Sequence, residues 1–568
     1  MNTKTISLIG IFFFLYLFFV YDTDFHGPDE PIYCAYTASI VEDGDLNAVN
    51  HLNQKYPYYL PDGKVGVSKT YNLPDYHNHG GVIFWVPFYL YAKFAYFFIS
   101  KFRLNYGIDD FINCSMSFST ILFGFLAVLL TFLFCKIFFS WLAALWSTLI
   151  MFLGTPFFYF LLSEVGNAQI LAMLLSILSI WFCSYVIGRK KSHWFLYGLF
   201  LSMCVIVKID LWFQIFFIIC LFIALVLLKQ IQWKYGVYFL SGLVPGVILK
   251  IINDFIKYGT LHLGEFKLLN FKSFYFLEQL FSSYHGFCYT SPVFYLCLFG
   301  LVAIIISLLK GLSLDDKNKM RDVFLLFLSI YLFMKIFILS FRYAWGGGTP
   351  GARILLTEFP VFVLLYARAL QTQKRLIGKV IFVSISVLFV FWNLIVVSEF
   401  IAGVDLKYMI NPPSLYQRIQ MLKLVINPLF YVQDMSLKLY SCLPLLPAAV
   451  LGIILGMKKM AQPISLSFWY YREENKNRSR YSKIFILFTV YSCLTYLVIT
   501  VLNVHNNKRN VEKMQAKGVF KNAEVIQPKN FEKMENIGSL NELIEYYTVK
   551  GDISMVNKIR KLKKKFYN

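Results

Sequence analysis

Apolar residues follow one another in long uninterrupted runs along almost the whole chain, and short polar segments separate these runs. Such runs predict helices that cross a bilayer, because backbone groups in hydrocarbon must find their hydrogen-bond partners within one segment. The strands of a transmembrane barrel would instead alternate apolar and polar positions. The fourteen apolar segments are residues 5–21, 84–99, 112–136, 141–160, 167–187, 194–208, 212–228, 235–252, 292–309, 322–340, 354–370, 377–397, 442–457 and 483–501.

Short basic clusters follow every second apolar segment, so we expect them to share the cytoplasmic side of the membrane. The net charge of +22 then reflects membrane topology, and no nucleic-acid partner is expected. The five clusters are Arg189-Lys190-Lys191, Lys229 with Lys234, the stretch Lys310–Arg321, Lys374-Arg375 with Lys379, and the stretch Lys458–Lys483.

The segment at 84–99 decides the topology. With the N-terminus inside, a full crossing by this segment would place all five basic clusters outside. An interfacial helix leaves the clusters inside and keeps the loop at 22–83, with nine acidic residues and three lysines, outside. Aromatic residues around Pro87 also suit the interface. We therefore predict an all-α polytopic bundle of about thirteen transmembrane helices, whose first extracytoplasmic loop (22–111) carries an interfacial helix.

The chain ends and the cysteines add further expectations. No small-x-small cleavage site precedes Asp22, so the first apolar segment is expected to stay as a helix. We assign 1–502 to the transmembrane domain and 503–568, with fourteen Lys and Arg, to an outward basic tail of short helices. Most of the ten cysteines lie in apolar segments and read as buried hydrophobes. Cys34 and Cys288 both face outward in this topology, which leaves a disulfide between them open.

Polar residues collect in three outward loops. Charges that face a bundle interior at the membrane boundary are candidates for function, because their desolvation is costly. The first loop contains Pro28-Asp29-Glu30-x-x-Tyr33, Glu42-Asp-Gly-Asp-Leu46, and His79-Gly-Gly followed by Pro87-Phe-Tyr89; the second contains Gly154-Thr-Pro-x-x-Tyr159 and Glu164; the third contains Arg342 and Trp345-Gly-Gly-Gly-x-x-Gly-x-Arg353.

Together these motifs resemble the GT-C glycosyltransferase superfamily, which includes protein O-mannosyltransferases and the aminoarabinose transferases of lipid A. The resemblance covers about residues 1–400 through several short motifs, and residues 401–568 resemble no family. It implies a bacterial inner-membrane enzyme that transfers a sugar, with inversion, from a polyprenyl-phosphate carrier to an extracytoplasmic acceptor. That acceptor would be lipid A, a lipopolysaccharide core, another envelope glycan or a protein.

The resemblance also implies roles for single residues. Asp29 matches the general base, which takes the proton of an acceptor hydroxyl as the new C–O bond forms, and Glu30 matches its companion acid. Glu164 matches an acid that binds metal or orients the acceptor. The leaving lipid phosphate needs cationic partners, and the candidates near outward helix ends are Arg353, Arg342 and Lys208. Tyr33 is a candidate to stack on a sugar ring, and His79 is a candidate to bind substrate.

Several alternatives stay open. Asp29 and Glu30 also suit the start of a helix, and the pair around Gly44 also suits a turn. A divalent metal ion held by His77, His79 and Glu164 is an alternative to histidines without a role. The rival functions are an O-antigen polymerase or ligase, a transporter or lipid flippase with charges such as Lys335 and Asp210 inside helices, and an inactive scaffold.

Overall fold

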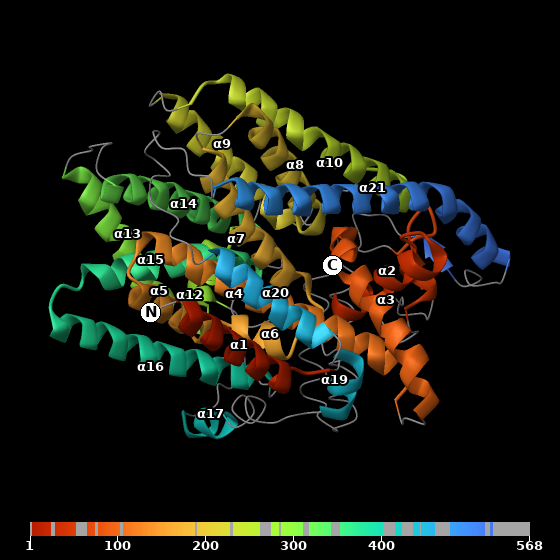
Figure 1. The fold of residues 1–568 in the computed structure, drawn as a ribbon, viewed down its shortest axis with the longest axis horizontal. Coiled ribbons are helices and arrows are strands. Elements are labelled where there is room, and N and C mark those ends of the chain that lie inside the picture. Colours follow the sequence, from red (N-terminus) through yellow and green to blue (C-terminus); the bar gives the residue numbers. More distant parts are fainter. Residues whose placement is uncertain are drawn as a thin grey trace.

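The computed structural model gives the fold of most of the chain (Figure 1). The residues that it describes are 3–23, 29–52, 65–73, 78–102, 106–187, 190–227, 231–261, 274–282, 286–310, 317–341, 353–401, 415–422, 435–442, 445–460, 478–516 and 523–525. Most of these residues are helical, and each of the fourteen apolar segments contains a helix, as predicted. In the described residues, the strands are short: β1 (Val65–Val67) pairs in parallel with β2 (Ala523–Val525).

The N-terminal half contributes α1 (Thr3–Val20), α2 (Asp29–Ala38), α3 (Val82–Ile99), α4 (Ile108–Phe138), α5 (Trp141–Leu153), α6 (Phe157–Leu162), α7 (Ala168–Val186), α8 (Lys191–Val207), α9 (Trp212–Leu227) and α10 (Lys234–Tyr258). The C-terminal half contributes α11 (Phe276–Phe281), α12 (Phe287–Thr290), α13 (Val293–Leu309), α14 (Lys317–Leu339), α15 (Phe359–Thr372), α16 (Leu376–Ile401), α17 (Leu415–Met421), α19 (Met435–Cys442), α20 (Leu445–Met460) and α21 (Arg478–Ala516). In Figure 1, α8, α9 and α10 stand together at one edge, and α21 runs beside α10.

Length and apolarity make this chain a multi-pass membrane protein. Nine helices among the described residues can cross a bilayer, and α19 with α20 adds one if this pair, bent by 72°, forms a single span. Shorter apolar helices lie at Leu8–Val20, Trp141–Leu153, Lys191–Val207 and Val293–Leu309. Because α3 is long and apolar enough to be one of the nine, the thirteen crossings and the interfacial placement of α3 stay predictions.

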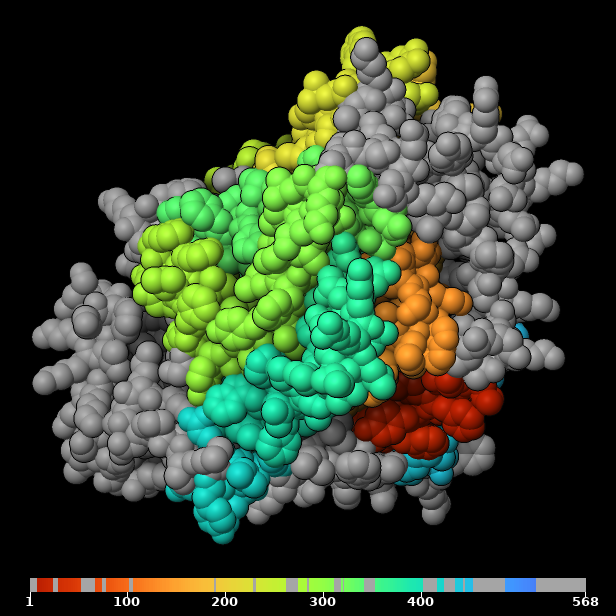
Figure 2. All heavy atoms as spheres, turned by 90° about the vertical axis from the view of Figure 1, so that its left-hand side faces the viewer, coloured from red at the N-terminus to blue at the C-terminus, as the bar shows by residue number. Residues whose placement is uncertain are grey.

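The outer surface of the bundle suits contact with lipid tails. Figure 2 shows one face to which α13 and α16 contribute. The side chains that these helices expose are large and apolar, and they include Phe299 and Val302 on α13 and Ile377 and Leu388 on α16. In water such a continuous apolar face would promote aggregation, whereas in a bilayer it is the solvated surface.

The predicted segment at 141–160 is divided in the structure. Helix α5 ends at Leu153, and α6 begins after Pro156. Proline cannot continue the helical hydrogen-bond ladder, which explains the break. Residues 154–162 are all buried, so the Gly154-Thr-Pro motif lies inside the protein rather than on an exposed loop.

The predicted domain boundary at 502/503 falls within α21, which continues for several turns beyond it. Three asparagines on this continuation hold the turn at 43–46 of the first loop. Asn503 accepts from the Leu46 N–H at 3.0 Å, Asn506 donates to the Gly44 carbonyl at 3.1 Å, and Asn510 donates to the Asp43 carbonyl at 3.0 Å. The first part of the tail is therefore integral to the fold, and the helices expected later in it lie outside the described residues.

Helices α8 and α10 pack closely through small residues. A Cβ on Gly242 would lie 2.1 Å from the Phe195 carbonyl oxygen, and a Cβ on Gly198 would lie 2.1 Å from the Phe239 carbonyl oxygen. One turn further on, a Cβ on Gly246 would meet Ser202. Small residues spaced by four positions let two helix backbones approach in a membrane, where no hydrophobic effect drives helices together.

Replacing Gly242 by Ala should force α8 and α10 apart, because the obstructing atom belongs to backbone that cannot rotate away. Overpacking of this kind costs about 1–3 kcal/mol. We expect a lower midpoint of thermal unfolding for the Gly242→Ala protein in detergent. The matched control is Gly452→Ala on α20, where nothing lies within 4 Å of the added methyl group. Equal midpoints for the two variants would contradict the close packing.

Candidate functional site

The structure joins the first and third loops through an ion pair between Asp29 and Arg353. The Arg353 Nη1 atom lies 2.9 Å from Asp29 Oδ2, and the two side chains are 14% and 10% exposed, respectively. Asp29 lies in the first turn of α2, where a carboxylate also interacts favourably with the helix dipole. Sequence analysis selected both residues, and the contact between them emerges only in three dimensions.

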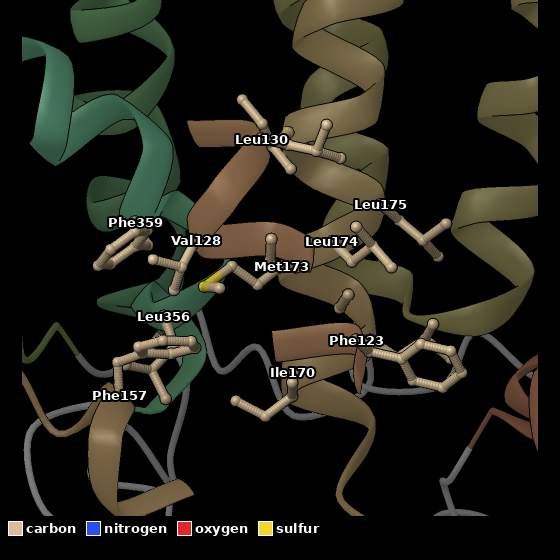
Figure 3. Packing of buried hydrophobic residues seen from close by; sticks show 14 of the residues in the cluster. Phe123, Val128, Leu130, Phe157, Ile170, Met173, Leu174, Leu175, Leu356 and Phe359 are labelled. Atoms are coloured by element: carbon tan, nitrogen blue, oxygen red, sulfur yellow. The ribbon is translucent and has the colours of Figure 1, made fainter. Parts of the chain in front are cut away.

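Arg353 begins a short 3₁₀ helix, η7 (Arg353–Glu358), that leads into α15. Packing fixes this helix in the bundle. In Figure 3, Leu356 and Phe359 face Met173 of α7, Val128 of α4 and Phe157 of α6. The rings of Phe157 and Phe359 lie 5.0 Å apart. The buried turn that carries the Gly154-Thr-Pro motif therefore supports the element that presents Arg353.

The other end of η7 is held by a fully buried charge network. Lys335 of α14 donates to Glu358 Oε1 at 2.8 Å and to Thr357 Oγ1 at 2.6 Å, while the Tyr331 hydroxyl donates to the same Glu358 oxygen at 2.5 Å. Both charged side chains are 0% exposed. Sequence analysis noted Lys335 as a charge in an apolar segment but missed Glu358. An acid near the start of an apolar segment is just as costly to bury, so it also indicates a buried partner.

The remaining candidates lie near the same end of the bundle. We call this the loop end and define it by residues 29–52, 78–81, 208–211 and 353–358. Glu30 is fully buried beside Asp29, and the Tyr33 ring packs against Trp85 at a tilt of 46°, with 4.9 Å between ring centres. Lys208 follows α8, and Glu164 lies in the turn after α6; both are buried.

His79 is buried in a 3₁₀ turn, η3 (His79–Gly81), against the end of α8. A Cβ on Gly80 would lie 2.5 Å from the Ile206 carbonyl oxygen, so only glycine permits this approach. The His79 ring stacks on Tyr496 of α21 at 6.2 Å and lies 6.3 Å from the Tyr36 ring of α2. His79 therefore joins three elements rather than standing in a wet loop.

A buried lysine that sequence analysis did not select completes this region. Lys257, near the end of α10, donates to the Tyr36 hydroxyl, and its backbone carbonyl accepts hydrogen bonds from Ser68 and Thr70 of the first loop. It is 1% exposed. The sequence could have indicated Lys257, because it follows an apolar segment, and a lysine buried at that position is costly unless it is paired.

Glu42 connects the first loop to α3. It lies in a π-helical turn, η1 (Ser39–Asp43), and accepts hydrogen bonds from the Tyr89 hydroxyl at 2.7 Å and from Lys93 Nζ at 2.9 Å. Burial raises the pKa of Glu42, but these hydrogen bonds and the Lys93 charge outweigh it, so the net pKa is lower than usual. The carboxylate form therefore persists and keeps this link intact.

Two of the open alternatives are decided by the structure. The Asp43-Gly44-Asp45 segment forms a turn, as predicted, with Gly44 at φ +70°. All ten cysteines are free thiols in the structure, so the disulfide between Cys34 and Cys288 is not formed there. Burial, with the nearby charges of Asp109 and Glu42, raises the pKa of Cys34 to about 12, which suppresses the thiolate needed for exchange.

The described residues include only part of the candidate metal site. His77 and Arg342 lie outside the described residues. Within the residues described, no group of three His, Cys, Asp or Glu side chains is arranged to hold a metal ion. The described residues of this region supply a carboxylate, a guanidinium and buried lysines.

Removing one charge from the Lys335–Glu358 pair should destabilise the protein by about 3–5 kcal/mol, because the other charge stays buried. We expect Lys335→Met to unfold at a much lower temperature than wild type, and the double variant Lys335→Met, Glu358→Gln to recover most of the loss. Lys93→Met removes one partner of a largely exposed ion pair and serves as the control. A double variant as unstable as Lys335→Met would contradict this account.

Comparison with known proteins adds no identification. No protein-family model, no curated protein and no solved structure matches the chain. The chemistry of the loop end is therefore the basis for assigning a function.

Proposed function

We propose that this chain is a membrane glycosyltransferase of the GT-C type. It moves a sugar from a polyprenyl-phosphate donor to an envelope glycan, lipid or protein acceptor on the extracytoplasmic face of a bacterial inner membrane. One observation carries the proposal: the motif residues Asp29 and Arg353, distant in the sequence, form a mostly buried ion pair at the loop end. A carboxylate beside a guanidinium supplies the base and the phosphate partner that such a transfer requires.

The resting ion pair suggests how the two residues act. The donor phosphate competes for the Arg353 guanidinium, whose planar fork binds phosphate as well as carboxylate. Loss of this partner frees Asp29 to accept the proton of the acceptor hydroxyl. The hydroxyl oxygen then bonds to the anomeric carbon as the bond from that carbon to the phosphate oxygen breaks, and the phosphate leaves paired with Arg353.

Neighbouring residues have supporting roles in this proposal. Lys208 adds positive charge for the lipid phosphate, and Arg342 retains the same assignment from its motif. Glu30 and Glu164 orient the acceptor. Tyr33, buried and tilted against Trp85, keeps its assignment as a candidate sugar contact. No step requires a metal ion, and the apolar bundle would hold the polyprenyl tail.

The contacts of the first loop support the proposed sidedness. The charge pattern predicts that this loop and the C-terminal ends of α10 and α21 lie outside. In the structure, the loop binds Lys257 of α10 and Asn503 and Asn510 of α21, and β1 pairs with β2 of the tail. All of these segments are therefore at one end of the bundle, as a common extracytoplasmic side requires.

The two charges considered for the transporter alternative, Lys335 and Asp210, lie in or against the loop end, since Lys335 donates to Glu358 and Asp210 is one of its residues. Lys335 lies only four residues before the end of α14, and Asp210 lies in η5 (Ile209–Leu211), directly before α9. A transporter site formed by them would be expected near the middle of the spans. An envelope polymerase or ligase, or an inactive scaffold, would not require a base at Asp29, so substitution there separates these rivals from the proposal.

Replacing Asp29 by Asn should lower sugar transfer by at least about 100-fold, because the amide cannot accept the proton. The assay compares cells that lack the gene with cells that carry wild type or a variant, and measures polyprenyl-phosphate sugars by mass spectrometry. We expect these lipids to accumulate without the gene and with Asp29→Asn.

The matched control for this assay is Asp109→Asn, an exposed acid in the first turn of α4. It should restore normal lipid levels, provided that immunoblots show equal amounts of each protein in the membrane. Normal lipid levels in cells without the gene would contradict the proposed function. Full complementation by Asp29→Asn would contradict the role of Asp29 alone.

Exchanging the two charges distinguishes chemistry from architecture. If Asp29 and Arg353 only stabilise the fold, the double variant Asp29→Arg, Arg353→Asp should regain both membrane abundance and activity. If they act as base and phosphate partner, the exchange should improve abundance over either single variant and leave transfer absent. The measurements are immunoblotting of membranes and the same lipid analysis. Active exchanged protein would refute the catalytic assignment.

A further inference from the structure

Cys114 and Cys442 meet between α4 and α19, at a place that the proposed site does not use. Their Sγ atoms lie 3.9 Å apart, and both residues are 0% exposed. The Tyr21 hydroxyl at the end of α1 touches both sulfurs, at 3.2 Å from Cys114 and 3.7 Å from Cys442. Thiols in van der Waals contact need to approach by only about 2 Å to reach disulfide bonding distance.

The helices that carry the two thiols are fixed on either side of the pair. Lys438 of α19 donates to the Phe19 and Tyr21 carbonyls, which caps the C-terminal end of α1. Ser436 and Tyr106, which precedes α4, share a hydrogen bond of 2.6 Å. The hydrogen bonds of Lys438 and Ser436 thus hold α19 in place, with Cys442 opposite Cys114.

Both cysteines lie near helix ends that we expect to face the oxidising side of the membrane. Cys114 lies about one turn after Asp109 and Asp110, the acids in the first turn of α4, and Cys442 is the last residue of α19, before the bend to α20. The charge pattern places both of these helix ends outside, where disulfides form and persist. This step rests on the sidedness in the proposed function.

We propose that Cys114 and Cys442 form a disulfide in the mature protein, which ties α19 to α4 covalently. The oxidant is a disulfide-bearing oxidoreductase or small disulfide, encountered while the chain folds and the thiols are still accessible. One thiolate attacks the oxidant and forms a mixed disulfide, and the second displaces the reduced oxidant. Two electrons pass to the oxidant, whose two sulfurs take up the two protons that the cysteines lose, so that an oxidoreductase leaves as a dithiol and a small disulfide leaves as two thiols.

The bond would reinforce the contacts that α19 already makes with α4 and α3. Since the two cysteines are far apart in sequence, the closed loop is long, and long loops gain most in the chain-entropy account of disulfide stabilisation. Among the described residues, Cys114 and Cys442 are the two cysteines whose sulfur atoms touch each other. We therefore expect one specific cross-link.

The test reads the cysteines directly in the full-length protein. Membranes are denatured in the presence of N-ethylmaleimide, the protein is digested without reductant, and peptides are identified by mass spectrometry. We expect a peptide pair joined at Cys114 and Cys442, which disappears on reduction, and labelled thiols at the other eight cysteines. Finding both Cys114 and Cys442 labelled in this first step would overturn the proposal.

Two controls make either outcome interpretable. Cys442→Ser should abolish the joined peptides and leave Cys114 labelled, whereas Cys288→Ser should leave the joined peptides unchanged. A cysteine introduced at the exposed Lys101, between α3 and α4, and labelled in intact cells with an impermeant maleimide reports the side of the membrane on which α4 begins and Cys114 lies. If Cys114 and Cys442 are reduced and the cysteine of Lys101→Cys is labelled from outside, the disulfide alone is refuted. If they are reduced and that cysteine is not labelled from outside, the proposed sidedness is refuted as well. Neither readout requires transferase activity.

Discussion

The ion pair between Asp29 and Arg353 is the contact on which the loop end depends. Two charges withdrawn from water repay their desolvation only if their geometry is fixed. Each partner is accordingly held by its own surroundings. Tyr33 on Trp85 and Tyr36 under Lys257 fix α2, and the packing of η7 on α7 fixes Arg353. A polar contact between distant segments is thereby supported by apolar packing on both sides.

Helices α14 and α15 show the same principle over the length of the bundle. They run antiparallel and are joined by charges at both ends. Asp322 near the start of α14 accepts two hydrogen bonds from Arg368, at 3.1 and 2.8 Å, and Lys335 near its end donates to Glu358. A slip of one helix along the other would break both pairs and leave charges in a medium where they are costly. The register of α15, and with it the height of Arg353, is set in this way.

The sequence predicts the helices of this fold better than it predicts which side chains contact one another. Runs of apolar residues identify all fourteen helical segments, because hydrocarbon allows so few alternatives. Motifs select Asp29 and Arg353, yet hydropathy carries no information on which charges meet. The same limit explains why Glu358 and Lys257 went unnoticed, and why Cys34 and Cys288 were considered as a pair while Cys114 and Cys442, in two apolar segments, were taken for ordinary core residues.

The asparagines of α21 bear on why the acidic first loop keeps its place. Asn503, Asn506 and Asn510 repeat at helical spacing, so their side chains share one face of the helix. An amide both donates and accepts, and it therefore satisfies the carbonyls and N–H groups of a tight turn without adding charge. A row of lysines would attract the carboxylates of Asp43 and Asp45 away from their partners His51 and Ser39. These neutral amides fix the turn and add no cation to those that Arg353, Lys208 and Lys257 already bring to this region.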